Sequence, residues 1–217
     1  MRSTLWHWFT VLLLICCRLG NGLAAPKPHT IVLGKWQPVS MVPESGAAQP
    51  VKIRRLLVDD HVKEYTVGPP HEVTDRLFVI RRAYRQNDSL PDDTKKPPQW
   101  IWRLGGWISV DRMTGHIAQL NLPAFDAEVS AASWYRDYAA YCGSSDDGSK
   151  IYMMVSQLGK RKPVVKKEFA GPGCVAPKWE RGPSRVTFTA AGEKASFIVR
   201  GRGADFQPET SEEEGPQ

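Results

Sequence analysis

The sequence has no apolar run of the roughly 20 residues that a membrane-spanning helix requires. Its clearest uncharged apolar run, from Trp8 to Cys17, is about half that length. It has neither a collagen-like glycine repeat nor the apolar scarcity of a disordered chain, since 41% of its 217 residues are hydrophobic and 24% are charged. These absences exclude a multi-span membrane protein, a collagen-like fibre and a wholly disordered chain, and the length suits one sizeable domain.

Motifs for common catalytic chemistry are missing as well. The sequence has no Gly-x-Ser-x-Gly, no glycine-rich phosphate loop and no dinucleotide fingerprint. We therefore expect no cofactor. A catalytic carboxylate pair remains open, but the spacing selects no two of the candidates, which are Asp92, Asp93, Asp126, Glu128 and Asp137.

The N-terminus is typical of a secretory signal peptide. Arg2 supplies a positive start, the apolar run follows, and Gly22 and Ala24 place small residues at the −3 and −1 positions of a cleavage site. Cys16 and Cys17 lack the preceding small residue that lipoprotein processing needs. We therefore expect residues 1–24 to be removed, leaving a periplasmic or secreted chain without a transmembrane segment.

Cysteine is scarce, with four residues in the chain. Cys16 and Cys17 leave with the signal peptide, so Cys142 and Cys174 remain. In an exported protein, two remaining cysteines predict one disulfide. The alternative, a nucleophilic cysteine, is disfavoured because neither residue has a histidine close by in the sequence.

Charge is distributed unevenly along the chain. The complete chain has a formal charge of +6, which loss of the two signal-peptide arginines lowers to +4. Residues 203–217 carry five carboxylates and no basic residue, so residues 25–202 carry +9. A basic body followed by an acidic, disordered tail is expected to be attracted to anionic surfaces.

Alternating apolar and polar residues between turn residues predict an all-β fold. We expect a single domain of about ten short antiparallel strands, arranged as a sandwich or as propeller-like sheets. The expected boundaries are an N-terminal extension or linker over residues 25–50, a β domain over residues 51–202 and the tail over residues 203–217. Within the extension, Ile31–Leu33 is expected to form a short strand.

Residues 100–111 carry the clearest local pattern. Two runs rich in aromatic and β-branched residues flank Gly105-Gly106, which predicts a hairpin with a tight turn because glycine tolerates positive φ. Pairing across that turn would place Trp100, Trp102 and Trp107 on one face. This face is interpreted either as core or as an exposed platform for sugar rings.

Two segments resemble blade pieces of WD-like β-propellers of the TolB type. Val110 to Leu120 contains Asp-x-x-Thr-Gly, and Ser145 to Val155 contains Ser-x-Asp-Gly-x-x-Ile. Each motif occurs once, whereas a propeller needs at least four blades of about 40 residues. The chain as a whole resembles exported bacterial proteins, a resemblance that implies no particular activity.

Basic residues gather within eight positions around a predicted hairpin turn, at Lys160, Arg161, Lys162, Lys166 and Lys167. A second basic group consists of Arg81, Arg82 and Arg85. Outside the cytoplasm the available anions are lipid head groups, cell-wall polymers and acidic proteins, so the first cluster is predicted to bind anions. Nucleic acid is not expected, because aromatic residues are not interleaved with these cations. The alternative is a solvated hairpin end.

A metal site would require converging histidine, cysteine or carboxylate groups. Asp59–His61 and His71-Glu72 flank one predicted strand and could meet in space. Aspartate and histidine are also ordinary turn residues, so no metal is predicted.

These features predict an exported protein of the cell envelope that works by binding or structural association and contacts an anionic partner through the basic cluster. The alternative is a carbohydrate-active or hydrolytic envelope enzyme. A cleft lined by tryptophan with two facing carboxylates would favour the enzyme.

Overall fold

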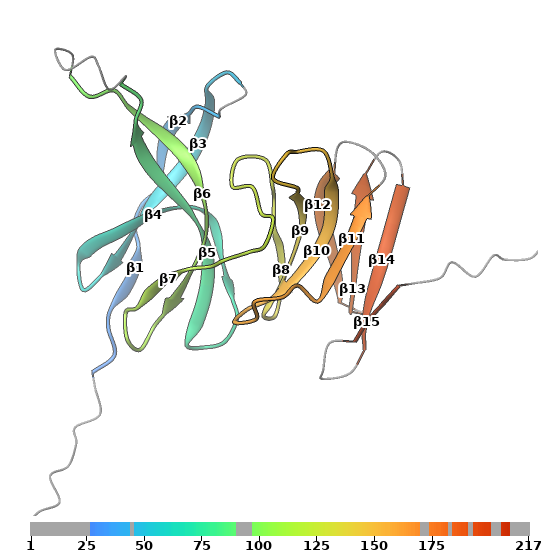
Figure 1. Ribbon diagram of the computed structural model, residues 1–217. Coiled ribbons are helices and arrows are strands. Elements are labelled where there is room, and N and C mark those ends of the chain that lie inside the picture. The colour runs from blue at the N-terminus through green and yellow to red at the C-terminus, as the bar shows by residue number, and fades with distance from the viewer. Residues whose placement is uncertain are drawn as a thin grey trace, which may run out of the picture.

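Strands are the only regular secondary structure in the part of the chain that the computed structural model describes, which is residues 27–43, 46–89, 97–169, 174–181, 184–190, 193–200 and 205–208. The strands β1 to β15 form one seven-stranded and two four-stranded sheets (Figure 1). The predicted all-β fold is confirmed, with more strands than expected. The predicted signal peptide, residues 1–24, lies outside the described residues.

The N-terminal sheet closes on itself. Strand β3 pairs with β2 and β4, β5 pairs with β4 and β6, and β2 lies beside β6, so these five strands form a ring that we call the closed sheet. The β2–β6 contact is parallel and the others are antiparallel, while β1 and β7 add to β3 and β6. The bounds are β1 (Ile31–Leu33), β2 (Gln37–Met41), β3 (Gln49–Val58), β4 (His61–Glu72), β5 (Leu77–Asn87), β6 (Trp100–Asp111) and β7 (Ile117–Gln119).

Side chains from alternate residues fill the inside of the ring, because successive side chains of a strand point to opposite faces. One buried cluster consists of Leu56, Phe78, Ile80, Ile108 and Val110. A second consists of Met41, Ile53 and Ala83, with the partly buried Trp102 and Leu104 among the side chains packed against it. The ring therefore has its own apolar core.

The segment expected to be an extension or linker, residues 25–50, supplies two strands of this sheet. Ile31–Leu33 forms the expected strand, β1, whereas β2 was not expected. Prolines gave this segment the composition of a loop, yet Pro38 lies within β2, opposite Lys52 of β3. The boundary expected at residue 51 falls inside β3, and the described part of the extension belongs to the fold.

The hairpin predicted at Gly105-Gly106 is wrong. Residues 100–111 form a single strand, β6, that pairs with β5 along its length. Trp107 pairs with Arg81 and Leu104 with Ala83, so both glycines lie opposite the single residue Arg82. A Cβ on Gly105 would be 3.2 Å from the Cβ of Arg82. The two glycines therefore form a β-bulge, where β6 approaches Arg82 of β5 closely, and they do not form a turn.

The C-terminal half forms two four-stranded sheets that pack face to face (Figure 1). The first contains β8 (Ser133–Tyr135), β9 (Tyr138–Ser144), β10 (Ile151–Gln157) and β11 (Val165–Phe169). The second contains β12 (Cys174–Arg181), β13 (Ser184–Ala190), β14 (Glu193–Arg200) and β15 (Asp205–Pro208). One core joins them, since Met153 and Phe169 of the first sheet cluster with Phe188 and Phe197 of the second. This half is a β-sandwich.

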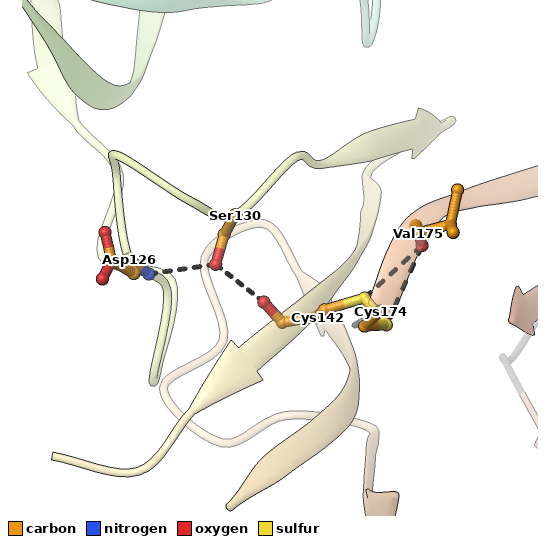
Figure 2. The surroundings of a disulfide bond; sticks show 5 residues. All are labelled: Asp126, Ser130, Cys142, Cys174 and Val175. Carbon is orange, nitrogen blue, oxygen red and sulfur yellow. Dashed lines mark hydrogen bonds between the residues drawn. A yellow bond between two sulfur atoms is a disulfide. The ribbon is translucent and has the colours of Figure 1, made fainter. Parts of the chain in front are cut away.

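The predicted disulfide between Cys142 and Cys174 is confirmed. It joins β9 to β12 with a Cα–Cα distance of 6.0 Å, and therefore links the two sheets of the sandwich (Figure 2). The Ser130 hydroxyl donates a 2.7 Å hydrogen bond to the carbonyl of Cys142 and accepts one from the Asp126 N–H at 3.2 Å. The segment that precedes β8 is thus held against the strand that carries the disulfide.

Within the region expected to be a disordered tail, Asp205–Pro208 forms β15 and pairs with β14. Residues 203–204 and 209–217 lie outside the described residues, and with them all the glutamates of the acidic tail.

The closed sheet and the sandwich meet along the segment from residue 120 to β8. Trp107 of β6 packs edge-on against Trp134 of β8, with ring centroids 5.3 Å apart. The guanidinium of Arg81 donates to the carbonyl of Ala127, and its burial lowers the pKa of Arg81. Aromatic packing and a partly buried cation therefore fix this junction, which positions the cleft described below.

Candidate binding surfaces

The predicted basic cluster lies on the turn between β10 and β11 and on β11 itself. Gly159, with φ of +77°, and a 3.0 Å hydrogen bond from the Lys160 N–H to the Gln157 carbonyl shape the turn. The Val164 N–H then donates to the carbonyl of Val155 at 2.7 Å and starts the returning strand. We call Lys160, Arg161, Lys162, Lys166 and Lys167 the basic hairpin.

All five side chains of the basic hairpin are exposed, and none has a carboxylate of the described residues within 4 Å. Several other basic residues are paired, among them Arg76 with Asp111 and Arg112 with Glu72. Unpaired cations at one hairpin can therefore interact with an anion outside the protein.

The structure brings the three turn cations together and separates the two lysines of β11. Lys166 lies opposite Met154 in the pairing with β10, and Lys167 lies opposite Met153, so the two lysines point to opposite faces. The Nζ of Lys166 lies 4.4 Å from the ring centre of Tyr152. Lys160, Arg161 and Lys162 are consequently the centre of the surface.

The second basic group does not form a patch. Arg81 is partly buried at the junction, and Arg82 pairs with Glu64 at 2.8 Å. Arg85 lies beside the rings of Trp100 and Trp102, at 5.8 and 5.7 Å from their centres. These arginines therefore make contacts within the closed sheet and at its junction, and they do not form a second basic surface.

The three tryptophans predicted to share a face do not form a common platform. Trp100 is 57% exposed near the end of β6, whereas Trp102 packs partly buried inside the closed sheet. Trp107 is buried against Trp134 on the opposite face. The prediction fails because residues 100–111 continue as one strand where a hairpin was expected, and the alternation of side chains along that strand places Trp102 and Trp107 on opposite sides.

The possible metal ligands do not meet either. Asp59–His61 form the turn between β3 and β4, while His71-Glu72 lie at the far end of β4. Asp59 is hydrogen-bonded to His29 at 2.5 Å, and this bond lowers the pKa of Asp59. Within the described ranges there is no group of three or more potential metal ligands.

The candidate carboxylates have structural contacts. Asp126 accepts the N–H of Glu128 at 2.8 Å, and Glu128 pairs with Arg103 at 3.2 Å. Asp137 accepts a hydrogen bond from the Gln157 amide at 2.8 Å. Asp92 and Asp93 lie outside the described residues.

A cleft of about 580 Å³, which the sequence did not predict, lies at the junction of the closed sheet and the sandwich. Three parts of the chain far apart in sequence line it: the end of β4, the β8–β9 hairpin and the end of β12. Its lining residues are His71, Glu72, Val73, Ser133, Trp134, Tyr135, Arg136, Trp179 and Arg181. No local motif unites these residues, so the cleft exists only in the folded chain.

Stacked rings and hydrogen bonds fix the walls of this cleft. The rings of Tyr135 and Trp179 stack with centroids 5.2 Å apart, and the indole N–H of Trp179 donates to the carbonyl of Ser133 at 3.0 Å. On the other wall His71 stacks on Trp134 at 5.9 Å, and its Nε2 is 2.8 Å from the carbonyl oxygen of Arg136.

The comparisons with known proteins give no match. No protein-family model, curated protein or solved structure matches the chain. Among the residues that the structure describes, there is also no helix of the length and apolarity needed to cross a membrane.

Proposed function

We propose that the protein is exported and works by binding, with the basic hairpin as its contact for an anionic component of the cell envelope. The single observation that supports this function most is a set of five exposed cations without carboxylate partners on one ordered hairpin. Export is supported by the signal-peptide pattern of residues 1–24 and by the disulfide, which suits an oxidising compartment.

The hairpin is a suitable scaffold for such a contact. β11 pairs with β10 over five consecutive residues, and the buried Val165 and Phe169 anchor it in the sandwich core. The turn is therefore held by a stable strand pair. Its cations can bind an anion without a large loss of backbone conformational entropy.

The test is retention on vesicles that contain an anionic phospholipid, compared with neutral vesicles. The chain, exported from its complete sequence, should bind anionic vesicles and lose binding as salt screens the charges. Because each basic residue near such a surface contributes about 1 kcal/mol, the triple variant Lys160→Glu, Arg161→Glu and Lys162→Glu should weaken binding by roughly a hundredfold or more.

The matched control is the triple variant Lys35→Glu, Lys52→Glu and Lys63→Glu. These lysines are exposed on the closed sheet, and the variant has the same net charge as the first. It should lose much less binding. Equal losses for the two variants would show attraction by net charge alone and would contradict a dedicated basic hairpin.

A further inference from the structure

We propose that the cleft at the junction binds an acidic saccharide, that is, a sugar ring that carries a carboxylate. The cleft is lined by residues outside the basic hairpin, so this inference does not depend on the function proposed above. Its volume of about 580 Å³ lies within the range of small-molecule sites in proteins.

The aromatic side chains supply the surface for a sugar ring. Trp134, Tyr135 and Trp179 are each partly exposed at the cleft, although their stacking and the Trp179–Ser133 hydrogen bond hold them in place. Such rings offer large, rigid contact areas at little cost in side-chain entropy. A pyranose suits this wall because its faces carry C–H groups and its rim carries hydroxyls.

The charges of the cleft specify an acidic ligand. Arg136 and Arg181 are exposed and have no carboxylate of the described residues within 4 Å. The one carboxylate in the lining, Glu72, is held by both terminal nitrogens of Arg112 at 2.7 and 2.9 Å. The Arg136 guanidinium lies over the ring of Tyr135, 5.2 Å from its centre. Its N–H groups and those of Arg181 remain to bind a carboxylate, whose geometry a guanidinium matches with two parallel hydrogen bonds.

The backbone at Arg136 adds an independent observation. Arg136 and Asp137 form the two-residue turn between β8 and β9, and Arg136 has φ of +52°. A two-residue hairpin turn with positive φ at its first central position favours glycine there. The chain instead has an arginine at the cleft in this strained conformation, and residues held in such conformations cluster at functional sites.

The test is calorimetric titration of the exported chain with digalacturonate and with its dimethyl ester, which keeps the rings but lacks the charge. Digalacturonate should bind at least tenfold more tightly than the ester. Arg136→Gln and Arg181→Gln should each weaken it by roughly tenfold or more, because a hydrogen bond to a charged group contributes about 1.5–3 kcal/mol. Arg55→Gln, an exposed arginine on β3 outside the cleft, should retain full affinity.

Arg136→Gly provides a second variant in case Arg136→Gln is poorly folded, since glycine relieves the positive φ and still removes the guanidinium. Equal affinity for the acid and the ester would overturn the proposal. So would unchanged affinity in both cleft variants, or no heat of binding with millimolar digalacturonate.

Discussion

Tyr141 shows how a single polar side chain is buried in the sandwich. Its hydroxyl donates a 2.8 Å hydrogen bond to the carbonyl of Pro123 and lies 3.0 Å from the Oγ of Ser156. The side chain is fully buried, and its ring packs edge-on against Phe125 at 5.4 Å. Burial raises the pKa of Tyr141 to about 12, although the hydrogen bond with Ser156 acts in the opposite direction.

This pKa predicts an alkaline dependence of stability. In the unfolded chain, tyrosine ionises near pH 10, before the folded protein releases the same proton. The unfolded state therefore binds fewer protons above pH 10, and the free energy of unfolding should fall as pH rises from about 10 towards 12. Urea unfolding curves at increasing pH should show this fall for the native chain and a shallower one for Tyr141→Phe.

Tyr152→Phe is the control, because Tyr152 lies on the neighbouring strand and is partly exposed. This variant should keep the fall in stability that Tyr141 causes. Identical slopes for the native chain and for Tyr141→Phe would show that Tyr141 is not the group responsible.

Two hairpins account for the segments that resemble propeller blades. Between β6 and β7, Asp111 accepts the N–H groups of Met113 and Thr114 at 2.8 and 3.1 Å and binds Arg76, which lowers the pKa of Asp111. Between β9 and β10, Asp147 accepts hydrogen bonds from Ser145 and Ser149, and the Ser145 hydroxyl is the main cause that lowers its pKa to about 2. An aspartate that closes a turn is sufficient to explain both motifs.

Strand β9 also carries a position where an added Cβ would be tightly crowded. A Cβ on Gly143 would lie 3.0 Å from the carbonyl oxygen of Ala124 and 3.0 Å from the Cγ of Met154. Gly143→Ala should therefore lower the free energy of unfolding by about 1–3 kcal/mol, the usual cost of overpacking. Chemical denaturation measures this change.

Gly46→Ala is the matched control, since its Cβ would meet one neighbour, the Cγ of Pro43, at 3.6 Å. Its midpoint should stay close to that of the native chain. A Gly143→Ala protein as stable as this control would mean that the segment before β8 does not pack tightly on β9.

At the scale of the whole molecule, the disulfide is the covalent link between the two sheets of the sandwich. Its cysteines are 32 positions apart, so the bond closes a loop of intermediate length. In the chain-entropy account, such a loop stabilises the folded state by about 3–4 kcal/mol. The double variant Cys142→Ser with Cys174→Ser should lose about this amount in denaturant titrations.

The closed sheet offers an internal comparison for that experiment. Loss of the disulfide should lower the stability of the closed sheet less than that of the sandwich, and amide hydrogen exchange of the two parts would show this difference. A thiol assay that finds both cysteines reduced in native exported protein would contradict the structural role of the bond.

Residue types alone predicted some features of this molecule, whereas features that depend on long-range strand pairing could not be predicted. The disulfide was predicted by simple elimination, because Cys142 and Cys174 are the cysteines that lie outside the expected signal peptide. Gly105-Gly106 was misread because a tight turn and a bulge both favour glycine, and the long-range pairing of β6 with β5 decides between them. The cleft could not be predicted, since Trp134 and Trp179 reach it from strands in different sheets.

The pairing of β2 with β6 completes the ring of the closed sheet. It consists of one residue pair, Met41 of β2 opposite Trp102 of β6. Because synthesis delivers the N-terminus first, β2 is made about 60 residues before this partner, and contacts between distant residues form slowly. During that interval the free side of β2 is an open edge to which another chain could add. A nascent molecule is therefore most vulnerable to mispairing before β6 emerges, and a chaperone that shields extended segments would act at this stage.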